Sequence, residues 1–68
     1  MDEEVITRLM ALATHRSATV ATAAIYALGE SAPTATHIIK LLLDITESNS
    51  AERVSAAAKA LGRIFRNR

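Results

Sequence analysis

Cysteine and tryptophan are absent from this chain of 68 residues, and phenylalanine and tyrosine occur once each. The lack of cysteine excludes disulfides, thiolate metal sites and a thiol nucleophile, and it mildly favours a cytoplasmic location. Two glycines and one proline are too few for the turns of an all-β fold or for a disordered linker. No apolar run comes near the roughly 20 residues of a membrane-spanning helix, so no membrane contact is expected.

Half of the residues are apolar, and most of these are small or aliphatic, with 14 alanines, 7 leucines and 6 isoleucines. This mixture favours closely packed helices. Eight basic residues against seven acidic ones leave a net charge of +1, and this overall charge does not by itself point to a polyanionic partner. A chain of this length buries only about 60% of its unfolded surface, so its stability margin is thin.

The chain repeats itself after 33 residues without a gap. Val5-Ile6 falls on Ile38-Ile39, and Ala27-Leu28-Gly29 falls on Ala60-Leu61-Gly62. Residues 33 apart are called equivalent below. The repeat predicts one domain, 1–68, built from two similar units, 3–31 and 32–66.

Each unit is predicted to hold two helices. In the first unit, Asp2 caps a helix that stops near residues 15–16, and Ser17 caps a second helix that ends at Gly29 or at the polar residues after it. In the second unit, a helix opens at residues 32–33, and Ser50 caps the last helix after a loop at 46–49.

The expected fold is therefore all-α, with two stacked antiparallel helix hairpins. Alanines on the second helix of each unit allow the helix axes to approach closely. The third helix is apolar nearly all round, from Ile38 to Ile45, which predicts a central helix covered on more than one side.

Residues 50–64 resemble the second helix of a HEAT repeat of the phycobilisome-lyase type, through the Ala-Ala stretch and the Ala60-Leu61-Gly62-Arg63-Ile64 ending. The first unit is similar from Val20 to Gly29. The resemblance implies a short HEAT-like α-solenoid, and by analogy an accessory subunit of a bilin lyase. Two departures are a serine in place of the family's capping Asp and the reversed order Arg53-Val54. The family's Arg pairs with an acidic residue of a neighbouring repeat, and this sequence leaves that pairing in question.

The residues indicate no enzyme and no cofactor. His15 and His37 have no acidic neighbour three or four residues away that would complete a metal site. The carboxylates are located at helix starts and solvated positions. Ser17 and Ser50 are helix caps, and Ser31, Ser48 and Ser55 have no base nearby.

Two surfaces are candidates for binding. The last helix carries basic residues without an acid near its end, which predicts either ordinary solvation of a helix C-terminus or a nucleic-acid patch made of Lys59, Arg63, Arg66 and Arg68. Second helices line the concave side of HEAT-like stacks, so the resemblance also implies a protein-binding surface made of Thr19, Thr22, Tyr26, Lys59 and Arg63. Tyr26 is either an exposed anchor there or packed against a neighbouring helix.

Two units are fewer than a solenoid usually needs for independent stability. The first helix is apolar over a wide face, and the last helix ends in Ile64-Phe65. Something is therefore expected to cover the two ends. Either the chain is a homo-oligomer, for example a two-fold dimer, or it docks on a larger protein partner; an excised or designed fragment held by alanine-rich packing is the remaining alternative.

Overall fold

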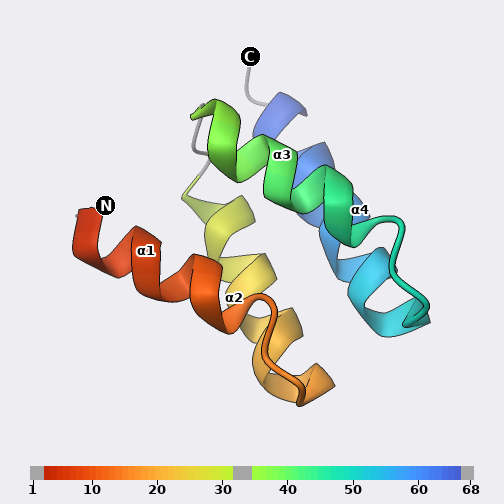
Figure 1. Cartoon of the computed structure of the whole chain (residues 1–68). Coiled ribbons are helices and arrows are strands. Elements are labelled where there is room, and N and C mark those ends of the chain that lie inside the picture. Colours follow the sequence, from red (N-terminus) through yellow and green to blue (C-terminus); the bar gives the residue numbers. More distant parts are fainter. Residues whose placement is uncertain (1–2, 32–34, 67–68) are drawn as a thin grey trace.

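The computed structural model describes residues 3–31 and 35–66, and these form four helices and no strand. The helices are α1 (Glu3–Leu12), α2 (Ala18–Glu30), α3 (Thr36–Ile45) and α4 (Ala51–Arg66). Figure 1 shows two helix hairpins stacked on each other, with α1 and α3 on one side and α2 and α4 on the other. The predicted all-α fold of four helices is confirmed. None of these described helices is long and apolar enough to cross a membrane.

Serine side chains begin the second helix of each hairpin, as predicted. The Val20 amide donates to Ser17 Oγ at 3.4 Å, and the Arg53 amide donates to Ser50 Oγ at 3.3 Å. These bonds satisfy amides that have no partner within the first turn of a helix. Helix α1 ends at Leu12, a few residues before the predicted end. The predicted starts at Asp2 and at residues 32–33 lie outside the described residues.

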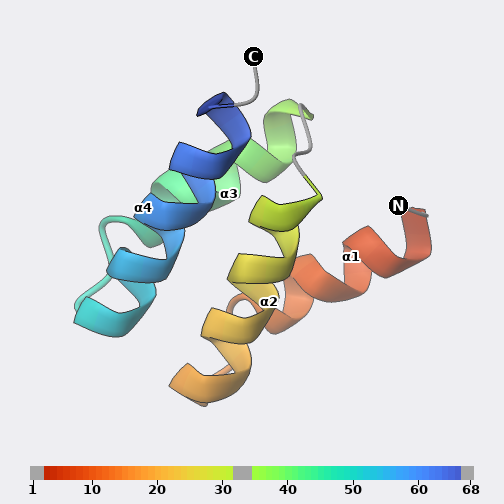
Figure 2. The same ribbon diagram turned by 180° about the vertical axis from the view of Figure 1, so that it is seen from behind.

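Helices α2 and α4 form the centre of the stack, and the prediction that α3 is central was wrong. Helix α2 packs against α1 on one side and most extensively against α4, which lies beside it in Figure 2. Helix α3 packs mainly on α4. It buries Ile38, Leu42 and Ile45 in one core cluster with Ile25 and Leu28 of α2, while Leu43 stays 52% exposed. The alanine-rich α2 and α4 approach closely, and this places the bulkier α3 on the side of the stack.

Gly29 marks a close approach of the two hairpins. It lies inside α2, which continues to Glu30 and is capped by Ser31, so the polar residues and not the glycine end this helix. A Cβ built on Gly29 would be 2.7 Å from Ala60 Cα in α4, closer than real Cβ atoms come to another carbon. The glycine therefore permits the contact between the hairpins.

Arg53 joins the two hairpins by hydrogen bonds. Its Nη2 donates to the backbone oxygens of His15 and Arg16, at 2.7 and 2.8 Å. These carbonyls follow the end of α1, where no further helical turn supplies amide partners. An α4 side chain thus fastens the loop between α1 and α2.

Replacing Arg53 with alanine is expected to lower the free energy of unfolding by about 1 kcal/mol, because two charge-assisted hydrogen bonds are lost at a site partly open to water. Urea unfolding followed by circular dichroism measures this change. Arg53→Lys is the matched control, since it keeps the charge and removes the two-pronged donor. Full stability in Arg53→Ala would show that the bonds to the loop contribute nothing.

Candidate protein-binding surface

A hollow in the surface lies where α2 and α4 run side by side. It is lined by Tyr26, Lys59, Gly62, Arg63 and Arg66. Lys59, Arg63 and Arg66 are three, four or seven residues apart, a spacing that places them on one face of α4. Tyr26 and Lys59 are equivalent residues, so the repeat itself brings them to the same side of the stack.

Tyr26 is 43% exposed at this hollow, which favours the anchor over the packed alternative. Of the predicted protein-binding surface, the structure brings together Tyr26, Lys59 and Arg63. The hydroxyl of Thr22 donates to the Ala18 carbonyl oxygen at 2.8 Å within α2, so it is already used locally. Thr19 lines a separate, almost wholly apolar hollow between α1 and α2.

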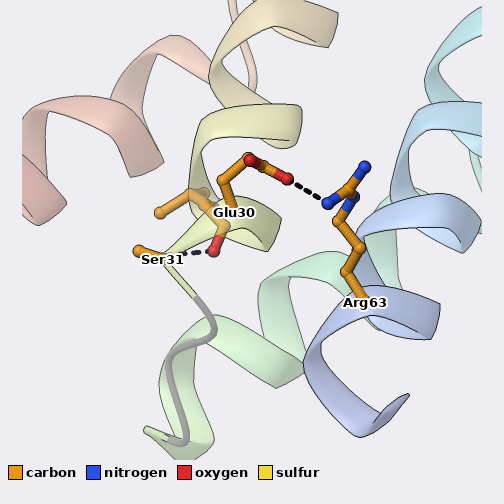
Figure 3. Close-up of polar contacts among 4 residues, drawn as sticks. Glu30, Ser31 and Arg63 are labelled. Carbon is orange, nitrogen blue, oxygen red and sulfur yellow. Dashed lines mark hydrogen bonds and ion pairs between the residues drawn. The ribbon is translucent and has the colours of Figure 1, made fainter. Parts of the chain in front are cut away.

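An ion pair connects the two helices at the edge of the hollow. Arg63 Nη1 pairs with Glu30 Oε1, and the Ser31 hydroxyl donates to the Leu28 carbonyl oxygen at 2.9 Å beside it (Figure 3). Both charged side chains are more than half exposed, so the pair contributes little to stability. It holds the Arg63 guanidinium between α2 and α4. Glu30 was missing from the predicted surface, although it is the equivalent of Arg63.

Three of the four residues of the predicted basic patch lie together. Lys59, Arg63 and Arg66 line the same hollow as Tyr26, whereas Arg68 lies outside the described residues. A single aromatic ring among three cations is a small platform for bases, because single-strand binding relies on stacking of successive bases. The arrangement suits carboxylates and an apolar group placed on one partner.

Among the described residues, neither histidine belongs to a group of three or more possible metal ligands. His15 Nδ1 accepts a hydrogen bond from the Ser17 amide at 3.0 Å, which holds the ring against the loop. Residues 3–31 and 35–66 contain no group of three or more His, Asp or Glu side chains that could hold a metal ion. In the same part of the chain, no polar or charged side chain is buried. The hollow at Tyr26 is built from charged side chains and one aromatic ring.

Comparison of the chain with protein-family models, with curated proteins and with solved structures finds no match.

Proposed function

We propose that this protein is a non-enzymatic, HEAT-like interaction module that presents a rigid helical surface to a protein partner and also associates with itself. The observation that carries the proposal is the hollow on α2 and α4, where exposed Tyr26 lies among three cations. Tyrosine and arginine are among the residue types that most often dominate the binding energy of protein interfaces.

The surface is supported by the most tightly packed part of the molecule. Ile25 and Leu28 of α2 are fully buried, as are Ala56 and Ala57 of α4, so the backbone beneath the hollow is held in place. A preorganised surface loses little conformational entropy when it binds. This rigidity favours a scaffold or docking role.

The chemistry of the hollow selects an acidic partner. Lys59, Arg63 and Arg66 line it, and the acidic Glu30 at its edge is paired with Arg63. An acidic segment carrying a leucine or an aromatic group would meet the cations with its carboxylates and the Tyr26 ring with its apolar side chain.

The uncovered ends of the stack support self-association. Val5 on α1 and Phe65 on α4 are 46% and 48% exposed, and an apolar hollow lies between α1 and α2. Apolar surface of this kind at both ends of a two-unit stack favours coverage by another molecule.

A glutamate- and leucine-rich helical peptide is a suitable probe for the hollow. Tyr26 is the single tyrosine in a chain without tryptophan, so intrinsic tyrosine fluorescence reports directly on it. We expect a fluorescence change that saturates with peptide, binding that weakens with salt, and roughly tenfold weaker binding for the double variant Lys59→Ala, Arg66→Ala. Tyr26→Ala lacks the fluorophore, so its binding is measured by titration calorimetry, and it should also be roughly tenfold weaker.

Two probes serve as controls for this experiment. A lysine- and leucine-rich peptide of equal length should leave the fluorescence unchanged. Binding of an oligothymidylate strand with no binding of the acidic peptide would contradict the proposal and favour the nucleic-acid alternative. A spectral change of a free bilin on mixing with the chain, again without peptide binding, would favour the lyase-subunit analogy.

A further inference from the structure

The apolar hollow between α1 and α2 has an equivalent in the second unit that is filled. The hollow is lined by Leu9, Leu12, Thr19, Val20, Ala23 and Ala24. In the first unit Leu9 and Leu12 are half-buried and Ala23 is exposed. Their equivalents Leu42, Ile45 and Ala56 are all buried, in one core cluster with Ile25 and Leu28 of α2. Side chains of α2 thus cover this surface in the second unit, whereas no residue within 3–31 and 35–66 covers the corresponding surface of the first unit.

On the opposite face of the stack the difference in burial is reversed, because there the residues of the first unit are buried and their equivalents in the second unit are more exposed. The face of α2 that packs on α4 contains Ala21, Ile25, Leu28 and Gly29, all of them buried. Its equivalents on α4 are less buried: Val54 and Leu61 are half-buried, and Ala58 and Gly62 are exposed. We call the hollow together with Ala27 the N-terminal face, and the set Val54, Ala58, Leu61 and Gly62 the C-terminal face. The C-terminal face is the equivalent of the α2 surface that contacts the second hairpin. The N-terminal face is the equivalent of the surface of the second hairpin that α2 covers.

Gly62 repeats the special feature of that contact. Gly29 lets Ala60 approach so closely that a Cβ would clash, whereas a Cβ on Gly62 would meet no described atom within 4 Å. The equivalent of Ala60 is Ala27, which is half-buried on the N-terminal face. A Gly62 to Ala27 contact between two copies would reproduce the Gly29 to Ala60 contact within one copy.

The charges are complementary in the same arrangement. Glu30 pairs with its own equivalent, Arg63, across the hairpins. Stacking a second copy in the same way would bring Arg63 of the first copy beside Glu30 of the second, and a guanidinium has enough N–H donors to serve two carboxylates. The residues up to 34 carry a charge of −2 and those from 35 onward +3, so the two ends attract each other.

From these observations we propose that the covering partner is a second copy of this chain, stacked head to tail, with the C-terminal face of one copy on the N-terminal face of the next. This geometry rests on the self-association in the proposed function and makes it specific. The contact is heterologous, unlike the two-fold dimer considered from the sequence, so further copies can add to either end.

The contact between copies is weaker than the one within the chain, for two structural reasons. The Arg53 bonds to the loop have no counterpart, because the equivalent residue is Val20. The buried side chain of Ile25 corresponds to the smaller Ala58, which fills less of the hollow. We therefore expect a reversible equilibrium with a Kd in the range of about 10 μM to 1 mM.

Three alanine-to-lysine variants test the geometry by sedimentation equilibrium. Ala23→Lys blocks the N-terminal face and Ala58→Lys blocks the C-terminal face. Ala11→Lys, at an exposed position of α1 outside both faces, is the matched control. Stacking predicts that the wild type and the control grow beyond dimers as concentration rises, that each blocked variant alone stays monomeric, and that an equal mixture of the two blocked variants forms a dimer and nothing larger.

Ala58→Ile is a second test, in which the association between copies should become tighter. The side chain restores the shape of Ile25 at an exposed position, so the fold is left intact, and the added methylene groups should tighten association on the order of tenfold. Unchanged association of this variant would count against the stacked geometry.

Other outcomes separate the inference from the proposed function. A blocked variant that still forms a dimer by itself, or a mixture that stays monomeric while the wild type associates, would overturn head-to-tail stacking and leave self-association standing. A wild type that remains monomeric to about 1 mM would overturn both stacking and self-association. The hollow at Tyr26 shares Gly62 with the C-terminal face, so binding of the acidic peptide is measured on the monomeric variant Ala23→Lys, in which only the N-terminal face is blocked and the hollow is intact.

Discussion

We expect Gly29→Ala and Gly62→Ala to change stability in opposite directions, although the two glycines are equivalent. The Cβ at residue 29 would be 2.7 Å from Ala60 Cα, which is backbone and cannot rotate away, so the hairpins must separate. Overpacking of this kind costs about 1–3 kcal/mol, more than the helix propensity that alanine restores. At Gly62 the Cβ meets open space, and the variant should gain about 0.5–1 kcal/mol.

Urea unfolding of the two variants at low protein concentration measures this difference, which should be about 1–3 kcal/mol between them, because alanine restores the same helix propensity at both positions. Low concentration matters because Gly62→Ala should also weaken head-to-tail association, by placing a methyl group where Ala27 of a second copy would lie. Equal stabilisation of both variants would contradict the close packing of α2 on α4.

The second large effect is expected at Leu28, which is fully buried between the hairpins. Leu28→Ala should lower the free energy of unfolding by about 2–5 kcal/mol. A chain of 68 residues has a total stability of roughly 3–10 kcal/mol, so a large fraction of this variant should be unfolded at 25 °C.

The equivalent Leu61→Ala is the matched control for Leu28→Ala. Leu61 is half-buried, so the same change should cost the isolated chain only about 1 kcal/mol. Thermal unfolding by circular dichroism compares the two variants directly. Similar losses at both positions would mean that the two leucines are buried alike, in conflict with the uncovered C-terminal face.

Much of the fold follows from the 33-residue repeat. The positions of Ser17 and Ser50 predicted where α2 and α4 begin, and the alanines predicted that these helices approach closely. The order of helices in space was harder to predict, because apolar periodicity reports how much of a helix is covered and not by what. Helix α3 looked central for this reason, yet Leu43 is exposed.

The glycines show a similar limit. In a sequence, a glycine after a helical pattern indicates a helix end, and the same residue also permits close packing of two helices. Only the position of Ala60 against Gly29 distinguishes these roles.

The candidate surface was predicted in part. The resemblance to HEAT repeats implied that Tyr26, Lys59 and Arg63 share one surface, and the structure brings these three residues to one hollow. The role of Arg53 was not predicted, since its acceptors are loop carbonyls 37 and 38 residues away in the chain. The reversed Arg53-Val54 order was the available signal, and it acquires meaning only once the loop after α1 is seen beside α4.

The most direct test of the stacked geometry is a dilution series of amide chemical shifts in the unmodified, isotope-labelled chain. Head-to-tail stacking predicts that residues on both faces shift together with one dissociation constant, including Ala23 and Ala27 on α2 and Ala58 and Gly62 on α4, while the exposed Leu43 on α3 does not. Concentration-dependent shifts confined to one face, or centred on α3, would contradict it.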